Sequence, residues 1–116
     1  MPMARDAAAA FQLPVLPDPI PEQRRFIRSD QYSFIREGIP SLAFKFGYEK
    51  GSEEEKLQTE WLKTRYHAVS DDLEQPVNKE GAARFTEYLT ALVKKVANEK
   101  RRPVWKRDSF FRQFAR

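Results

Sequence analysis

One long amphipathic stretch near the end of the chain constrains the fold more than any other feature. From Asn78 onward, apolar residues recur with the 3.6-residue period of an α-helix, and Asn is a residue type that caps helix N-termini. Such a helix is stable in water only when another element covers its apolar stripe. The pattern therefore predicts a long helix that forms one wall of a core. The stripe consists of Ala82, Phe85, Leu89, Leu92, Val93 and Val96.

Two shorter helices are predicted upstream. Ser29 is a helix-capping residue type and Gly38 a typical stop, which indicates a short helix over about residues 30–37. Ser52 is followed by three glutamates in the arrangement of a capping box, which indicates a second helix over about residues 53–63.

One run between these helices alternates in the manner of a β-strand. Residues 41–46 place Leu42, Phe44 and Phe46 on one face. A single strand leaves both of its edges unpaired, and only a weak run at residues 13–16 offers a partner. We therefore expect that the sheet to which this strand belongs is incomplete in the chain.

The two ends of the chain differ from its middle. Five of the eight prolines lie in the first 21 residues, so residues 14–23 are predicted to be an extended connector after the end of a truncated helix. Residues 94–116 hold nine Lys/Arg against two acidic residues, whereas residues 1–93 have a net charge of −3. Aromatic residues interrupt this basic tail, and we expect it to dock partly on a surface.

Length and composition exclude several classes of protein. With 116 residues the chain has the size of one ordinary domain. It contains no Cys, which excludes disulfides, zinc fingers, iron–sulfur clusters and thiol nucleophiles. No run reaches the roughly 18 apolar residues of a membrane span. The start also lacks the apolar stretch of a secretory signal peptide.

Two motifs carry candidate chemistry. The first is Phe-Ile-Arg-Ser-Asp-Gln-Tyr-Ser-Phe at residues 26–34, which is followed by Gly-Ile-Pro-Ser-Leu-Ala-Phe at residues 38–44. The second is Tyr-His-Ala-Val-Ser-Asp-Asp at residues 66–72, which contains the only histidine, His67. Imidazole is the commonest metal ligand in proteins, although most lone histidines are surface or core residues.

Together these motifs resemble the C-terminal part of the zinc-dependent aminopeptidase family that also includes glutamate carboxypeptidase and glutaminyl cyclase. The similarity runs over about residues 17–100. It implies an α/β fold, namely the C-terminal part of a three-layer zinc-exopeptidase domain with a mixed sheet flanked by helices. The chain then divides into a helix end and connector (1–23), the peptidase part (24–100) and a basic aromatic tail (101–116).

The resemblance also implies roles for individual residues. His67 matches the family's final zinc ligand. Tyr66 matches a residue that in some members points at the substrate carbonyl, where a phenol stabilises a developing oxyanion. Asp30 matches an aspartate that in glutaminyl cyclases joins a carboxylate network beside the metal. Asp71 and Asp72 match the paired acids after the ligand loop, to which we assign a supporting or helix-capping role.

The chain departs from the family pattern at three positions. Gln31 stands where the family commonly has His, and Ala68 and Val69 stand where Thr and Pro are frequent. The chain also lacks the second histidine, the bridging aspartate, the further carboxylates and the general-base glutamate of the family's two-zinc centre.

The resemblance therefore implies a fragment of a zinc metallopeptidase. The complete domain would hydrolyse N-terminal residues from peptides, with a peptide as its substrate and the missing N-terminal part of the domain as its partner. We expect zinc binding to be weak or absent in this chain alone, and the chain alone to be inactive. Family members are often periplasmic or secreted.

Two alternatives from other classes remain open. The basic tail would suit a nucleic-acid or anionic-membrane contact, and the exposed apolar residues would suit a small interaction module. Because residues 1–93 are net acidic and no helix-turn-helix or RNA-stacking pattern is present, we expect neither nucleic acid nor a membrane as a partner.

Overall fold

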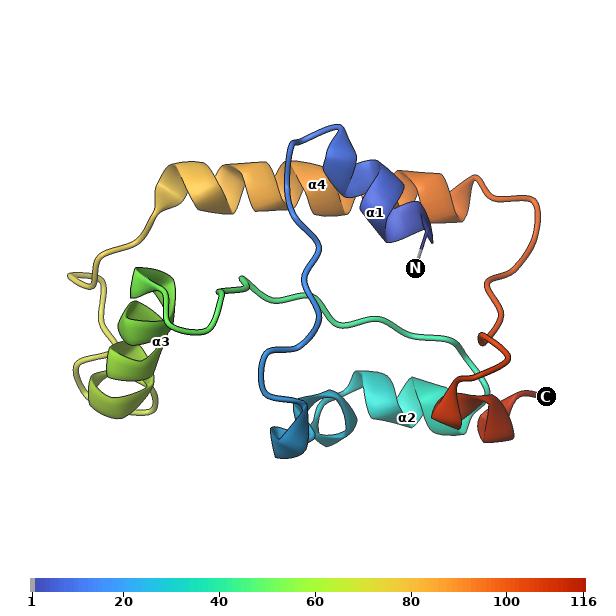
Figure 1. Cartoon of the computed structure of the whole chain (residues 1–116), viewed down its shortest axis with the longest axis horizontal. Helices are drawn as coiled ribbons and strands as arrows, with labels where there is room; N and C mark the ends of the chain where they lie inside the picture. The colour runs from blue at the N-terminus through green and yellow to red at the C-terminus, as the bar shows by residue number, and fades with distance from the viewer. Residues whose placement is uncertain (1) are drawn as a thin grey trace.

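The computed structural model describes residues 2–116 and consists of helices joined by long connections. Figure 1 shows two layers: α1 and α4 lie along one side, α2 lies along the other, and α3 stands at one end. The α-helices are α1 (Pro2–Ala9), α2 (Gln31–Arg36), α3 (Glu53–Thr64) and α4 (Lys79–Ala97). Three 3₁₀ helices accompany them: η1 (Pro21–Gln23), η2 (Arg25–Arg28) and η3 (Phe110–Phe114).

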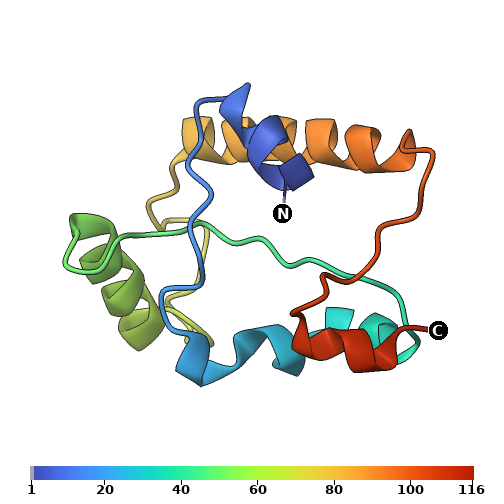
Figure 2. The same ribbon diagram turned by 45° about the vertical axis from the view of Figure 1, so that its right-hand side comes forward.

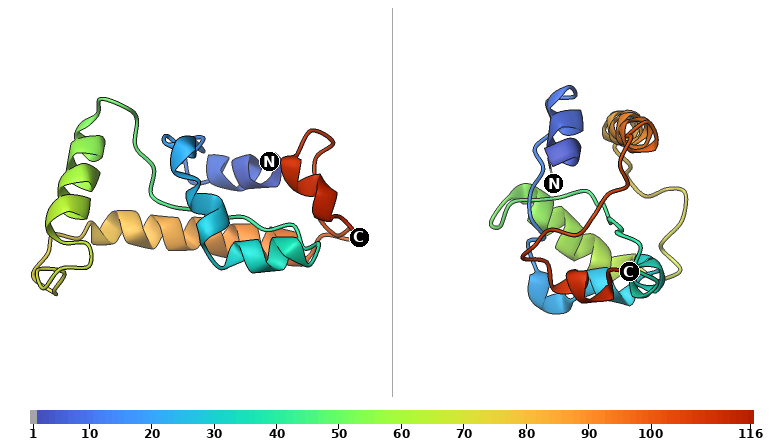
Figure 3. Two further views of the ribbon diagram at one scale, coloured as in Figure 1. Left: turned by 90° about the horizontal axis from the view of Figure 1, so that it is seen from below. Right: turned by 90° about the vertical axis from the view of Figure 1, so that its right-hand side faces the viewer.

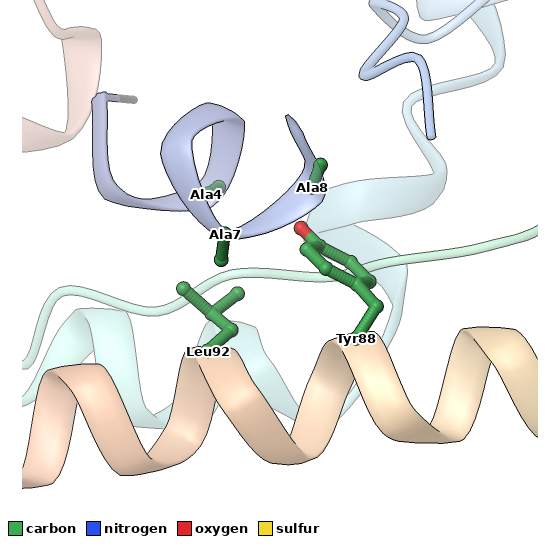
Figure 4. Packing of buried hydrophobic residues seen from close by; sticks show 5 residues of the cluster. All are labelled: Ala4, Ala7, Ala8, Tyr88 and Leu92. Atoms are coloured by element: carbon green, nitrogen blue, oxygen red, sulfur yellow. The ribbon is translucent and has the colours of Figure 1, made fainter. Parts of the chain in front are cut away.

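The main core lies between α4 and α1. Tyr88 and Leu92 of α4 are buried against the small side chains of α1, which allow the two helices to approach closely (Figure 4). As predicted, Asn78 caps α4, because its Oδ1 accepts a hydrogen bond of 2.8 Å from the Gly81 N–H. The buried residues differ from the predicted stripe: Tyr88 was not part of it, and Val93 remains 65% exposed. The buried residues of α1 are Ala4, Ala7 and Ala8.

The predicted sheet is absent, and the α/β assignment is wrong for residues 2–116. Those residues contain no β-strand. Residues 41–46 run extended between the two layers (Figure 2), but no second strand lies beside them, and their backbone N–H groups form no backbone hydrogen bonds.

Aromatic side chains of this extended segment pack on α4 instead. The Phe44 ring meets Tyr88 edge-on at a centroid distance of 5.7 Å, and Phe46 lies 4.6 Å from Phe85. Leu13, in the other strand candidate, likewise packs against the α1–α4 core without pairing. Of the alternating face, only Phe44 is half-buried, whereas Leu42 and Phe46 remain 43% and 61% exposed, so α4 covers this face only in part.

The basic tail docks on the second layer, as expected. Figure 3 (right) looks along α4 and shows η3 beside α2 and η2, on the side opposite α1 and α4. The Phe114 ring lies edge-on to Tyr32 at 6.3 Å, and Nη2 of Arg116 lies 2.9 Å from Oε2 of Glu37. Gly38 ends the turn after α2 at a φ of +82°, a backbone conformation that favours glycine. Among the described helices, none is long and apolar enough to cross a bilayer.

Candidate functional site

The segment around His67 begins with helix α3. Ser52 caps the helix by accepting a hydrogen bond of 3.2 Å from the Glu55 N–H, and Oε2 of Glu55 accepts one of 2.6 Å from the Gly51 N–H. The first bond is one half of the predicted capping box, whereas the second goes to Gly51 and not to the N–H of the capping residue Ser52. The first-turn acid Glu54 accepts hydrogen bonds from its own backbone N–H and from the Ser52 hydroxyl, both of which lower the pKa of its carboxyl group.

The loop after α3 is held against the end of the helix by hydrogen bonds. Trp61 donates its indole N–H to Oε1 of Gln75 at 2.8 Å, and Nε2 of Gln75 donates to Oδ1 of Asp71 at 2.7 Å. Ser70 donates its hydroxyl to the Thr64 carbonyl at 2.6 Å. The loop that carries His67 is therefore a closed, internally bonded turn.

His67 lies at the outer end of an aromatic stack. The Tyr66 ring lies 5.4 Å from Trp61, and the imidazole of His67 stacks on Tyr66 at 3.9 Å with the two planes 22° apart. Both Tyr66 and His67 are exposed. His67 has a φ of +58°, which is uncommon for a residue other than glycine, and the Ala68 N–H closes the turn on the Arg65 carbonyl at 2.9 Å.

The two acids after His67 bond within the loop. Asp71 is the acceptor for Gln75. Oδ1 of Asp72 accepts a hydrogen bond of 3.0 Å from the Glu74 N–H and lies 3.7 Å from Nη1 of Arg65. None of the hydrogen bonds formed within residues 2–116 involves the imidazole of His67.

Asp30 belongs to the other layer. It directly precedes α2, is exposed, and its side chain makes no capping hydrogen bond. No hydrogen bond or ion pair within the described chain joins it to Tyr66 or His67. Gln31, at the position where the resembled family commonly has His, donates from Nε2 to the Phe26 carbonyl at 2.6 Å and ties α2 to η2.

The residues present do not fit a zinc site by themselves. Structural and catalytic zinc sites take at least three protein ligands. Within residues 2–116, no three His, Asp or Glu side chains come together in a way that would hold a metal ion. The structure brings Tyr66 and His67 together, and it places Asp71 in the same loop without a bond to the ring.

Sequence reasoning missed the partnership between Trp61 and Gln75. The two side chains are 14 residues apart. No local pattern marks such a pair, because its contact depends on the path of the whole loop.

The chain matches one family among known proteins. The model of peptidase family M28 matches residues 2–93, which is most of the chain and includes both motifs. No curated protein and no solved structure matches the chain. Because the family match covers far more than half of the sequence, the chain belongs to peptidase family M28, a family of metallopeptidases.

Proposed function

We propose that the chain supplies the His67 loop to an aminopeptidase-type zinc site, and that polypeptide outside residues 1–116 completes this site. The complete domain would hydrolyse the N-terminal residues of peptides. The observation that carries the proposal is the family match over residues 2–93, since this range includes the Tyr66-His67 pair in an exposed turn.

The stacking of Tyr66 and His67 supports their proposed roles. A metal ligand needs a fixed ring with a free nitrogen, and the imidazole is exposed, stacked on Tyr66 and without an internal hydrogen bond. The phenol of Tyr66 is half exposed, so it is accessible to a substrate carbonyl bound beside the loop. We assign to it the stabilisation of a developing oxyanion.

The lack of a ligand cluster supports a shared site. One histidine binds zinc weakly, and the further ligands and the general base would come from the completing polypeptide. Several large apolar side chains are exposed, including Phe46 and Leu57, and they offer surface for that polypeptide to cover. Asp30 would join the site only within the completed domain.

Transfer of the segment into a working enzyme tests the proposal. Residues 24–100 would replace the corresponding C-terminal segment of a characterised M28 aminopeptidase, and release of 4-nitroaniline from leucine-4-nitroanilide would be measured. We expect the chimera to be active and its His67→Ala variant to lose activity by at least about a hundredfold. Lys63→Ala, which removes an exposed charge just before the loop, is the matched control.

The isolated chain provides the second arm of this test. With added zinc, residues 1–116 should release no 4-nitroaniline above the buffer rate. Release that a chelator abolishes would contradict the proposal that the site is shared. A folded, active chimera that is indifferent to His67→Ala would contradict the ligand role.

A further inference from the structure

An open apolar hollow lies between η2 and η3, on the layer opposite the α1–α4 core. Its volume is about 510 Å³. Phe26, Ile27, Phe110 and Phe111 form most of its wall, and Arg24 and Arg25 also line it. Phe110 is 74% exposed, although it is a large aromatic residue. An exposed apolar surface of this kind indicates a contact surface.

Aromatic packing between two distant segments builds the hollow. Phe111 of η3 lies 5.3 Å from Phe26 of η2 and 5.6 Å from Trp105. Phe110 packs edge-on against Phe111 at 5.5 Å. The rings of Phe26, Trp105 and Phe111 thus cover one another, and Phe110 is the ring that projects from the cluster.

The segments that meet here also concentrate positive charge. Residues 21–37 and 100–116 together hold eleven Lys/Arg against four Asp/Glu, whereas the rest of the chain holds ten Lys/Arg against thirteen Asp/Glu. Docking of η3 brings Arg112 to the layer that carries Arg24 and Arg25, whereas the segment before η3 crosses to this layer from the end of α4 (Figure 1). Asp18 is the one carboxylate that lines the hollow, and it accepts a hydrogen bond of 2.9 Å from the Ile20 N–H.

We propose that this basic–apolar face, defined by Arg24, Arg25, Ile27 and Phe110, docks on an anionic lipid bilayer. The cations would bind lipid phosphates at the headgroup level, and Phe110 and Ile27 would enter the apolar boundary. Basic side chains beside exposed apolar ones are the combination that an anionic membrane surface attracts. The proposal is independent of the peptidase assignment and revises the expectation of no membrane partner.

The same observations argue against nucleic acid as the partner. Single strands bind to aromatic side chains whose ring faces are free for stacking. Here most of the rings pack on one another. Duplex DNA is commonly read by a helix in its major groove, and η3 has only five residues.

Co-sedimentation with lipid vesicles tests the proposal on the full chain. We expect binding at about 0.15 M salt to phosphatidylcholine vesicles with about one third phosphatidylglycerol, and little binding to pure phosphatidylcholine. Phe110→Ser should weaken binding about tenfold, because it removes one inserted aromatic side chain. The double variant Arg24→Gln/Arg25→Gln should weaken it about twenty-five-fold, because each cation contributes about a factor of five.

Matched controls separate the face from overall charge and hydrophobicity. Lys50→Gln/Lys63→Gln removes the same charge elsewhere, and Leu73→Ser removes an apolar side chain that is even more exposed than Phe110; both should change binding less than about twofold. All these residues are exposed or half-exposed, so the fold should survive, as circular dichroism would verify.

Equal binding to both vesicle types overturns the proposal. Wild-type binding by Phe110→Ser and by the double arginine variant overturns it as well. Displacement from the vesicles by a single-stranded oligonucleotide at the same salt also overturns it and favours nucleic acid.

Discussion

Trp61 donates its indole N–H to Oε1 of Gln75 at 2.8 Å and so joins the last turn of α3 to the far end of the loop that carries His67. Gln75 continues the connection by donating to Asp71 at 2.7 Å. Since Trp61 also packs against Tyr66, the same indole supports the aromatic stack and closes the loop. The orientation of His67 therefore depends on Trp61 of α3 and on Gln75, eight residues after His67 in the chain.

Gln75→Leu should loosen this loop. The substitution keeps the size of the side chain but removes both hydrogen bonds, at a cost of about 1 kcal/mol in the free energy of unfolding. In a ¹H–¹⁵N spectrum, the indole N–H resonance of Trp61 should move, and amide exchange should rise over residues 65–75. Gln113→Leu, at an exposed glutamine that forms no hydrogen bond in the described chain, should leave both readouts unchanged. An unmoved Trp61 resonance in Gln75→Leu would contradict the bond.

Gly38→Ala should release the C-terminal tail. A Cβ at this position would lie 2.9 Å from the Phe114 carbonyl oxygen, which is too close for real contacts, and the φ of +82° is unfavourable for alanine. We expect a loss of about 1–3 kcal/mol and faster proteolysis within residues 101–116. Gly51→Ala is the matched control, because Gly51 has a φ of +84° but no atom within 4 Å. It should lose stability without exposing the tail, and equal tail cleavage in both variants would argue against the contact.

Sequence reasoning located the three predicted helices because their signals are local, but the predicted Ser29 cap was wrong: the Ser29 hydroxyl donates to the Arg25 carbonyl at 3.4 Å, and Asp30 directly precedes α2. The capping residues Ser52 and Asn78 bond as their positions indicate, and Gly38 ends α2 with a positive φ. The strand at residues 41–46 was predicted from alternation alone. Alternation indicates an apolar face, but it does not show whether the neighbour of that face is a strand or a helix, or how fully it is covered. Here Tyr88 and Phe85 of α4 supply that neighbour.

The candidate site was predictable only as a list of residues. The motif at 66–72 located Tyr66 and His67 correctly in one loop after α3, but their stacking depends on backbone conformation that no sequence pattern specifies.

The hollow between η2 and η3 could not be predicted from local sequence patterns, for a different reason. It forms only because Phe26 and Phe111, which lie 85 positions apart in the sequence, pack together at 5.3 Å.

Leu92→Ala should destabilise the chain strongly. Leu92 is 5% exposed and packs against the small residues of α1, so the truncation leaves a cavity in the main core. Large-to-small substitutions of this kind cost about 2–5 kcal/mol, which is a large fraction of the stability of a chain this small. Val93→Ala on the same helix should cost no more than about 0.5 kcal/mol, because Val93 is mostly exposed. Urea denaturation measures both. Similar midpoints for the two variants would mean that α1 does not cover α4 in solution.

Tyr88 should make the fold sensitive to alkaline pH. Its ring is 3% exposed and rises from α4 toward Ala8 (Figure 4), and its hydroxyl group is buried without a hydrogen-bond partner among residues 2–116. Burial raises the pKa of this phenol above its ordinary value of 10.0. Up to about pH 9, the phenol is neutral in the folded and the unfolded chain alike and adds no pH dependence. Above 10.0, the unfolded chain loses this proton first, so the folded state binds more protons and the free energy of unfolding falls as the pH rises.

Tyr88→Phe removes the phenol and keeps the ring. At about pH 7 the variant should be as stable as the wild type or more stable by about 1 kcal/mol, because it no longer buries an unpaired hydroxyl. As the pH rises above 10.0, its advantage should grow, since only the wild type loses stability through this group. Urea denaturation of both proteins from about pH 7 to pH 11 measures the difference and cancels the titration of all other groups, which the two chains share. A difference that stays constant over this range would mean that the Tyr88 hydroxyl reaches water or a partner in solution, and that α1 covers it less completely than the structure shows.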